Sequence, residues 1–216
     1  MFALLRYTLG DTFDTQRWAA PVVSLGVIVS VVSAQTGSLL PTYAILATTM
    51  VFIGTWLTVV VVNNEDPVQQ NITESCAGSR AKVRLGKLLF SFVFCTTLGF
   101  LAMVPPIFLS SDRVRGDALL AGACAQAIAA LAAVGLGSVC SRPIVRRHAW
   151  SVLLGVLVAL GSVLIPDGVP SRQLFVLFNK TGQFALGVPI LLIGLETLAI
   201  CAVAVAASIK LSSARS

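Results

Sequence analysis

Long apolar stretches alternate with short polar segments along the chain. A helix needs roughly 20 apolar residues to cross a bilayer core about 30 Å thick, and six stretches approach that length. Hydrocarbon offers no water to backbone groups, so each stretch should be a helix that satisfies its own backbone. The pattern predicts an all-α, polytopic membrane protein with one domain over residues 1–216. Its six transmembrane helices are expected at residues 18–34, 43–62, 88–109, 118–140, 149–165 and 183–207.

The composition agrees with this class. Hydrophobic residues make up 56% of the 216 and charged residues only 11%, and the mean hydropathy is +0.92. An average soluble domain carries roughly 25% charged residues, so a soluble fold would have too little polar surface to cover its exterior. Glu196 is the only charged residue inside a predicted span.

Lysine and arginine are distributed unevenly over the connections. Eleven lie on the side that carries the N-terminal arm, residues 63–87, residues 141–148 and the C-terminal tail, and four lie on the opposite side. Short loops rich in Lys and Arg stay in the cytoplasm. We therefore expect a multi-pass protein of the cell (plasma) membrane with both termini cytoplasmic. The net charge of +6 reflects this topology and contact with anionic lipid headgroups, and it is no evidence for nucleic acid.

The segment before the first span, residues 1–17, has helical periodicity. Phe2, Leu5, Leu9 and Phe13 recur at helical spacing, while charged residues occupy other faces. Such a helix can lie in the membrane interface with its apolar stripe toward the acyl chains. The alternative is a polar leader that merely precedes a span.

The connection at residues 63–87 is long and carries helix boundary signals. Asp66 suits the N-cap, Pro67 the first helical position and Gln69 the third position of a capping box. Gly78 suits the left-handed position that closes a helix. The sequence predicts a short cytoplasmic helix from Pro67 to about residue 77, followed by a second helical segment from Arg80 to Lys87 capped by Ser79.

This short helix has a polar face. A rigid helix across the cytoplasmic mouth of the bundle is suited to docking on a soluble partner, and the alternative is a solvated connector without a partner. The candidate partner-binding residues are Asp66, Pro67, Gln69, Gln70, Thr73 and Glu74.

Two features of the spans concern helix packing. Small residues recur every four positions in the fourth span, which favours close approach of a neighbouring span or of a second subunit, although alanine enrichment alone would also give this pattern. Pro105, Pro106 and Pro189 remove backbone donors, so helices should bend or end near them. The small-residue ridge comprises Ala121, Ala125, Ala129, Ala133 and Gly137, continuing to Ser141.

Glu196 is a candidate intramembrane site. A charge at the centre of a span costs roughly 2.5–3.5 kcal/mol on insertion scales, so its side chain should face the protein interior. It could bind a cation or move protons, or it could form a structural hydrogen bond with Gln126, Gln183 or a hydroxyl group.

Several chemistries are excluded by composition. His148 is the only histidine, no cysteine pair has metal-ligand spacing, and no phosphate-binding Gly-x-x-x-x-Gly-Lys-Ser/Thr loop is present. We expect no catalytic residue, no bound metal and no cofactor in this chain.

An interfacial helix, six spans and a capped cytoplasmic helix between spans two and three together resemble a permease subunit of the ABC-2 exporter type. The residue-level resemblance covers about 25 positions between residues 63 and 88. It rests on Asn63-Asn64-Glu65-Asp66-Pro67-Val68-Gln69-Gln70-Asn71-Ile72-Thr73, Gly78-Ser79-Arg80 and Leu85-Gly86-Lys87-Leu88.

The resemblance implies a division of labour between subunits. Two permeases, identical or related, would pair in the membrane, and separate ABC ATPase subunits would bind ATP and Mg. The helix after Asp66 would be the coupling helix that docks on an ATPase, and residues 2–13 would be the elbow helix. The chain departs from the family pattern at residues 174–178, which are only moderately hydrophobic and leave outer re-entrant helices open.

The leading hypothesis is a permease of an ATP-driven exporter that moves a hydrophobic small molecule, a lipid or a peptide outward. Two other classes stay open. One is a stand-alone secondary transporter or channel centred on Glu196, and the other is a non-transporting assembly subunit or a membrane enzyme. Internal similarity between spans one to three and four to six, common in secondary transporters, is not visible.

Overall fold

The fold is all-helical over the residues that the computed structural model describes. These are residues 2–34, 39–109, 116–141, 148–164, 173, 176–177 and 188–214. The main helices are α1 (Phe2–Asp14), α2 (Ala19–Ala34), α3 (Leu39–Val62), α4 (Pro67–Ala77), α5 (Arg80–Ala102), α6 (Val104–Leu109), α7 (Gly116–Cys140), α8 (His148–Leu164) and α10 (Val188–Ala214).

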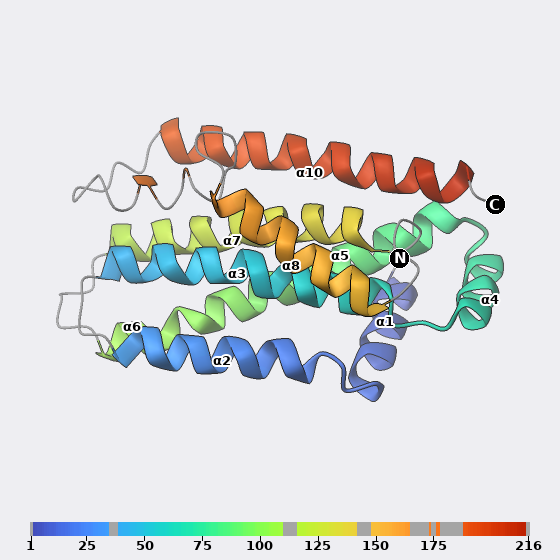
Figure 1. Cartoon of the computed structure of the whole chain (residues 1–216), viewed down its shortest axis with the longest axis horizontal. Helices are drawn as coiled ribbons and strands as arrows, with labels where there is room; N and C mark the ends of the chain where they lie inside the picture. Colours follow the sequence, from blue (N-terminus) through green and yellow to red (C-terminus); the bar gives the residue numbers. More distant parts are fainter. Residues whose placement is uncertain are drawn as a thin grey trace.

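The long helices form an elongated bundle, and α4 lies across one end of it (Figure 1). We call this end of the molecule the α4 end. From there α2 runs away, α3 returns, α5 and α6 run away again, α7 returns, α8 runs away and α10 returns. Consequently α1, α4 and the C-terminal end of α10 lie at the same end of the bundle, as an even number of passes requires.

Four helical segments are long and apolar enough to cross a membrane, or five if the bent pair α1–α2 is one span. The four are Leu39–Val62, Arg80–Leu109, Gly116–Cys140 and Pro189–Lys210. The apolar part of α8, Trp150–Ser162, is shorter than these. A helical protein with several potential spans is therefore confirmed, whereas the predicted number of six is not.

Part of the sequence prediction falls outside the described residues. The start of the sixth predicted span at residue 183, with Gln183, lies there, and so do residues 174, 175 and 178 of the outer loop. So do several of the cations that set the predicted orientation, namely Arg113, Arg115, Arg142, Arg146, Arg147, Arg172, Lys180 and Arg215.

The centre of the bundle is the contact between α3 and α7. The small-residue ridge of α7 is buried there and lies against α3. A Cβ atom built on Gly54 would lie 2.8 Å from Ala133 Cβ, and one on Gly137 would lie 2.6 Å from Thr58 Cβ. The absence of side chains at these glycines lets the two backbones approach closely, so the ridge packs against a neighbouring helix of the same chain.

Proline interrupts the third long segment as expected. Helix α5 ends at Ala102, Met103 forms a turn, and α6 continues from Val104. Pro105 has no N–H to donate to the carbonyl of Leu101, and its ring would clash with that carbonyl in a continuous helix. In α10, Pro189 is the second residue, where the missing donor costs little.

Helix α1 is bent by 79° from α2. It would therefore lie nearly parallel to the membrane plane if α2 crosses the bilayer, as the interfacial-helix prediction requires. Leu9 and Phe13 are exposed along it, while Thr8 and Thr12 are buried. Leu4 packs over Gly86 of α5 so closely that a Cβ on Gly86 would lie 2.0 Å from Leu4 Cδ2, and this contact fixes α1 on the bundle.

Helix α4 begins and ends where its boundary residues predict. Asp66 occupies the N-cap with φ −63° and ψ 145°, Pro67 is the first helical residue, and Gly78 is left-handed with φ 68°. The prediction that the Asp66 side chain caps α4 with a hydrogen bond is wrong, because this side chain makes no capping hydrogen bond. Ser79 precedes α5 and likewise makes no side-chain cap bond.

Candidate functional site

The α4 end holds a layer of polar contacts between helices. Its centre is an ion pair between Lys87 of α5 and Glu65, which lies in the short connection from α3 to α4. Lys87 Nζ is 2.6 Å from Glu65 Oε2, and the side chains are only 6% and 1% exposed. Thr73 Oγ1 of α4 donates a hydrogen bond of 3.2 Å to the other carboxylate oxygen, Glu65 Oε1. One carboxylate thus joins the α3–α4 connection, α4 and α5.

A second contact ties α4 to α1. Gln69 Nε2 donates a hydrogen bond of 2.8 Å to Tyr7 Oη. Burial raises the pKa of Tyr7 above its ordinary value, which keeps the phenol protonated at neutral pH. The side chain of Gln69 is thus turned toward α1.

The start of α5 is tied to α4 as well. Arg80 Nε lies 2.8 Å from Glu74 Oε2, and Gln70 Nε2 donates to Glu74 Oε1 at 2.9 Å. The Arg80 side chain is 48% exposed, so this pair is weaker than the buried one. Together with Gly78, it fixes the sharp turn between the two helices.

Two consecutive asparagines extend the layer from the end of α3. Asn64 Nδ2 donates to the carbonyl and the carboxylate of Asp11 in α1, at 2.9 and 2.7 Å. Asn63 Nδ2 donates to Ser151 Oγ of α8 at 3.1 Å, and Ser151 in turn donates to the carbonyl of Cys140 at the end of α7. The α3–α4 connection therefore contacts α1, α7 and α8.

Arg84 connects α5 to the end of α7. Its guanidinium donates to the carbonyl of Ser138 at 3.0 Å and to Ser141 Oγ at 3.2 Å. These bonds use a carbonyl of the last helical turn, where free acceptors remain. Through them, a tilt of α5 at this end would also displace α7.

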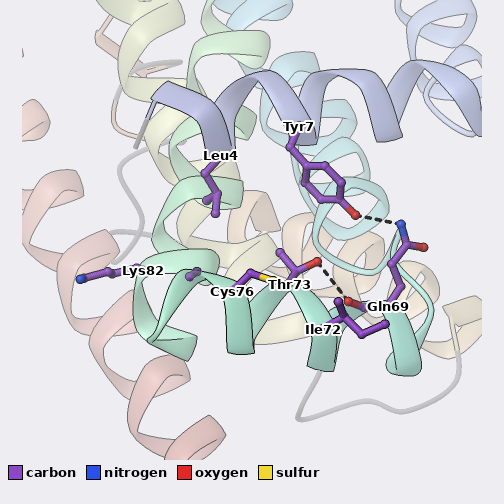
Figure 2. Close-up of a pocket in the computed structure, with 8 residues that line it drawn as sticks. Leu4, Tyr7, Gln69, Ile72, Thr73, Cys76 and Lys82 are labelled. Carbon is purple, nitrogen blue, oxygen red and sulfur yellow. Dashed lines mark hydrogen bonds between the residues drawn. The ribbon is translucent and has the colours of Figure 1, made fainter.

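A groove of about 800 Å³ runs between α1 and α4. Figure 2 shows Leu4 and Tyr7 pointing from α1 toward α4, and the Tyr7–Gln69 hydrogen bond near one end. Lys82 lies at the other end of this view. The lining residues are Leu4, Tyr7, Gln69, Ile72, Thr73, Cys76, Ala77 and Lys82.

The structure distributes the six predicted partner-binding residues over different faces of α4. Asp66 and Gln69 are exposed, whereas Gln70, Thr73 and Glu74 are half-buried and bonded within the chain. Pro67 starts the helix, and its side chain is not among those described. Other positions of α4 are exposed as well, namely Val68, Asn71, Ile72, Ser75 and Cys76.

Glu196 does not face the interior of this chain. Its side chain is exposed on α10, while Ile193 and Thr197 of the same helix are buried. The prediction of an inward-facing carboxylate is therefore wrong for the single chain. Gln126 is fully buried beside Gly99, and both polar atoms of its amide lack a hydrogen-bond partner, so it does not bond Glu196.

The sequence reading missed the residues that hold the layer together. Lys87 directly precedes the apolar span that begins at Leu88, and Glu65 follows the end of the preceding span at Val62 by three residues. A carboxylate before the short helix and a cation after it could have predicted this ion pair. The capped helix and its turn bring the end of one span and the beginning of the next to the same end of the bundle. Tyr7 and Asn64 carry no comparable sequence signal.

The contacts of this layer hold helices together. Within the described ranges, no group of three or more His, Cys, Asp and Glu residues could hold a metal ion. The two ionisable groups at the centre of the layer, Glu65 and Lys87, are paired with one another. No protein-family model, curated protein or solved structure matches the chain.

Proposed function

We propose that this chain is a permease subunit of an ATP-driven exporter, in which α4 is the coupling helix that receives work from a separate ATPase. The observation that carries the proposal is the buried Glu65–Lys87 pair with its bond from Thr73. A helix joined in this way cannot move without displacing the start of α5. A force applied to α4 would therefore reach the bundle.

The outer surface of α4 offers the docking site. Val68, Asn71 and Ser75 lie on one face and are exposed, and Val68 is 69% exposed. An apolar residue at the end of a polar surface helix is a common anchor for a partner groove. In this proposal Asp66, Val68 and Asn71 contact the ATPase, while Gln70, Thr73 and Glu74 transmit its movement to α5.

The alternative transport mechanism centred on Glu196 has less support. Glu196 is exposed on an outer helix, and Gln126, the most buried amide of the bundle, does not pair with it. The cargo remains the class expected from the sequence, a hydrophobic small molecule, a lipid or a peptide. A second permease would complete the pathway. The excess of Lys and Arg in the segments that include α1, α4 and the start of α5 supports a cytoplasmic location of this end.

The orientation is tested by thiol labelling in intact cells. Cys76 lies on α4 and is exposed, so a membrane-impermeant maleimide should modify it only after the membrane is opened. The matched control is Phe108→Cys at the opposite end of the bundle, where Phe108 is 82% exposed; this thiol should react without permeabilisation. Modification of Cys76 in intact cells would overturn the proposal.

The coupling role is tested on the purified permease–ATPase assembly. Val68→Glu should release a P-loop ATPase that co-purifies with the tagged chain. Asp14→Asn, at the exposed last residue of α1, should not. A combined Glu65→Gln/Lys87→Gln variant should retain the ATPase but lose ATP-driven transport in vesicles. Full transport by this variant, or a chain that transports without any ATPase, would contradict the proposal.

A further inference from the structure

The groove between α1 and α4 combines two kinds of wall. Leu4, Ile72 and Ala77 give it apolar surface, and the Tyr7–Gln69 bond adds polar groups. Its volume of about 800 Å³ is within the range of small-molecule sites, roughly 300–1,000 Å³. The groove is therefore large enough for part of an acyl chain and a glycerol backbone.

The charge at the rim of the groove indicates whether a bound molecule would be an anion or a cation. Lys82 lines the groove and is exposed, and within the described part of the chain it has no hydrogen bond or ion pair. The other cations at the start of α5 are engaged, since Arg80 pairs with Glu74, Arg84 bonds α7 and Lys87 pairs with Glu65. Among the described residues, no carboxylate lines the groove, and Glu65, which bonds the lining residue Thr73, is paired with Lys87. The electrostatics at the Lys82 end of the groove therefore favour an anion.

The position of the groove indicates the chemical class of the molecule that it would bind. Helix α1 is nearly perpendicular to α2, and its exposed Leu9 and Phe13 suit the acyl boundary of a membrane. A molecule that presents hydrocarbon to Leu4 and a phosphate to Lys82 at this boundary is an anionic lipid. Basic pockets beside spans on the cytoplasmic side are suited to such headgroups.

We propose that the α1–α4 groove binds one anionic glycerophospholipid of the adjacent leaflet, with its phosphate at Lys82 and its acyl chain between Leu4 and Ile72. The lipid would bridge the interfacial helix and α4 and thereby set their separation. The inference requires the groove and a membrane but no ATPase, so it stands or falls separately from the proposed exporter function.

Cys76 provides a direct reporter of occupancy because it lines the groove and is exposed. The intact chain is placed in nanodiscs of phosphatidylcholine alone or with added phosphatidylglycerol, and maleimide modification of each cysteine is followed by peptide mass spectrometry. Bound phosphatidylglycerol should slow the labelling of Cys76 about fivefold or more. A Phe108→Cys thiol at the opposite end of the bundle, where Phe108 is 82% exposed, should react equally in both discs and serves as the internal control.

Two variants that each remove one positive charge make the test specific. Lys82→Gln should weaken the protection by phosphatidylglycerol about fivefold, the effect of one cation near an anionic surface. Arg17→Gln removes one positive charge at an exposed position outside the groove and should leave protection of Cys76 in place. Size-exclusion profiles and the labelling rate of the Phe108→Cys thiol report whether each variant remains folded.

Three results would overturn the inference. Equal Cys76 rates in both discs would show that no anionic lipid enters the groove. Equal loss of protection in the Lys82→Gln and Arg17→Gln variants would show diffuse attraction instead of a site. Protection by inorganic phosphate in phosphatidylcholine discs would show a free anion in place of a lipid.

Discussion

The α4 end and the α3–α7 contact fix their helices in different ways. At the α4 end, helices α1, α4, α5, α7 and α8 are joined by directional polar bonds, and the central pair Glu65–Lys87 is buried. Along α3 and α7, contact depends on the absence of side chains at Gly54 and Gly137. A polar bond transmits a pull, whereas a steric contact resists only approach. The polar bonds at the α4 end can therefore carry a pull from one helix to another, while the α3–α7 contact limits how closely these two helices approach.

The largest expected effect tests the buried pair. Lys87→Met leaves the Glu65 carboxylate buried without its cation, which should cost about 3–5 kcal/mol of stability. The unfolding temperature of the purified protein in detergent is the measurement. The double variant Glu65→Leu/Lys87→Met should recover most of the loss, because apolar groups of similar size can replace a buried pair. A Lys87→Met protein as stable as the parent would show that the pair does not hold α5.

The next effect tests the steric contact. Gly137→Ala would bring a Cβ to 2.6 Å from Thr58 Cβ and 3.2 Å from the Thr55 carbonyl, and such overpacking should cost about 1–3 kcal/mol. The same substitution at Gly161 meets nothing within 4 Å and should stabilise α8 by about 0.5–1 kcal/mol. Both changes are read by thermal unfolding. Effects of the same sign would mean that α3 and α7 do not depend on close approach.

A smaller effect tests the turn that joins α4 to α5. Gly78 has φ 68°, a conformation that costs most residues about 1–2 kcal/mol. Gly78→Ala should lower stability by that amount and increase hydrogen exchange in α4. Gly78→Asn is the matched variant, because asparagine tolerates the left-handed region, and it should lose less. Equal loss in the two variants would place the effect elsewhere than in the backbone conformation.

The smallest expected effect tests the difference between the exposed Arg80–Glu74 pair and the buried Lys87–Glu65 pair at the α4 end. Arg80 is about half exposed, so Arg80→Ala should change stability by only about 0.2–1 kcal/mol, and added salt should reduce the difference further. Thermal unfolding at low and high ionic strength measures this. A loss as large as that of Lys87→Met would show that the exposed pair carries the connection.

Local signals explain what the sequence could predict. Asp66, Pro67 and Gly78 define the bounds of α4 through backbone preferences that need no neighbour, and Pro105 marks the break before α6 in the same way. Long-range pairing is different in kind. Glu65 and Lys87 are 22 residues apart, and their contact depends on how α3 and α5 pack.

The orientation of Glu196 could not be derived for a related reason. Helix α10 is apolar around its circumference, so its sequence has no stripe that separates a buried face from an exposed one. We expected the Glu196 carboxylate to face inward because a charge in lipid is costly. That cost disfavours contact with lipid in the assembled protein. It does not determine which face of α10 packs against the other helices of the same chain.

The unequal lengths of the helices have a consequence for the surrounding bilayer. Helices α2 and α8 have 16 and 17 residues, or about 24–26 Å of rise, whereas α7 and α10 have 25 and 27, or about 38–40 Å. In a hydrocarbon core about 30 Å thick, the long helices must tilt or project into the headgroups. If α2 and α8 also cross the bilayer, the lipids beside them must instead compress. The protein would thus impose a thickness gradient around its perimeter, and membranes of different thickness would favour different tilts of the same bundle.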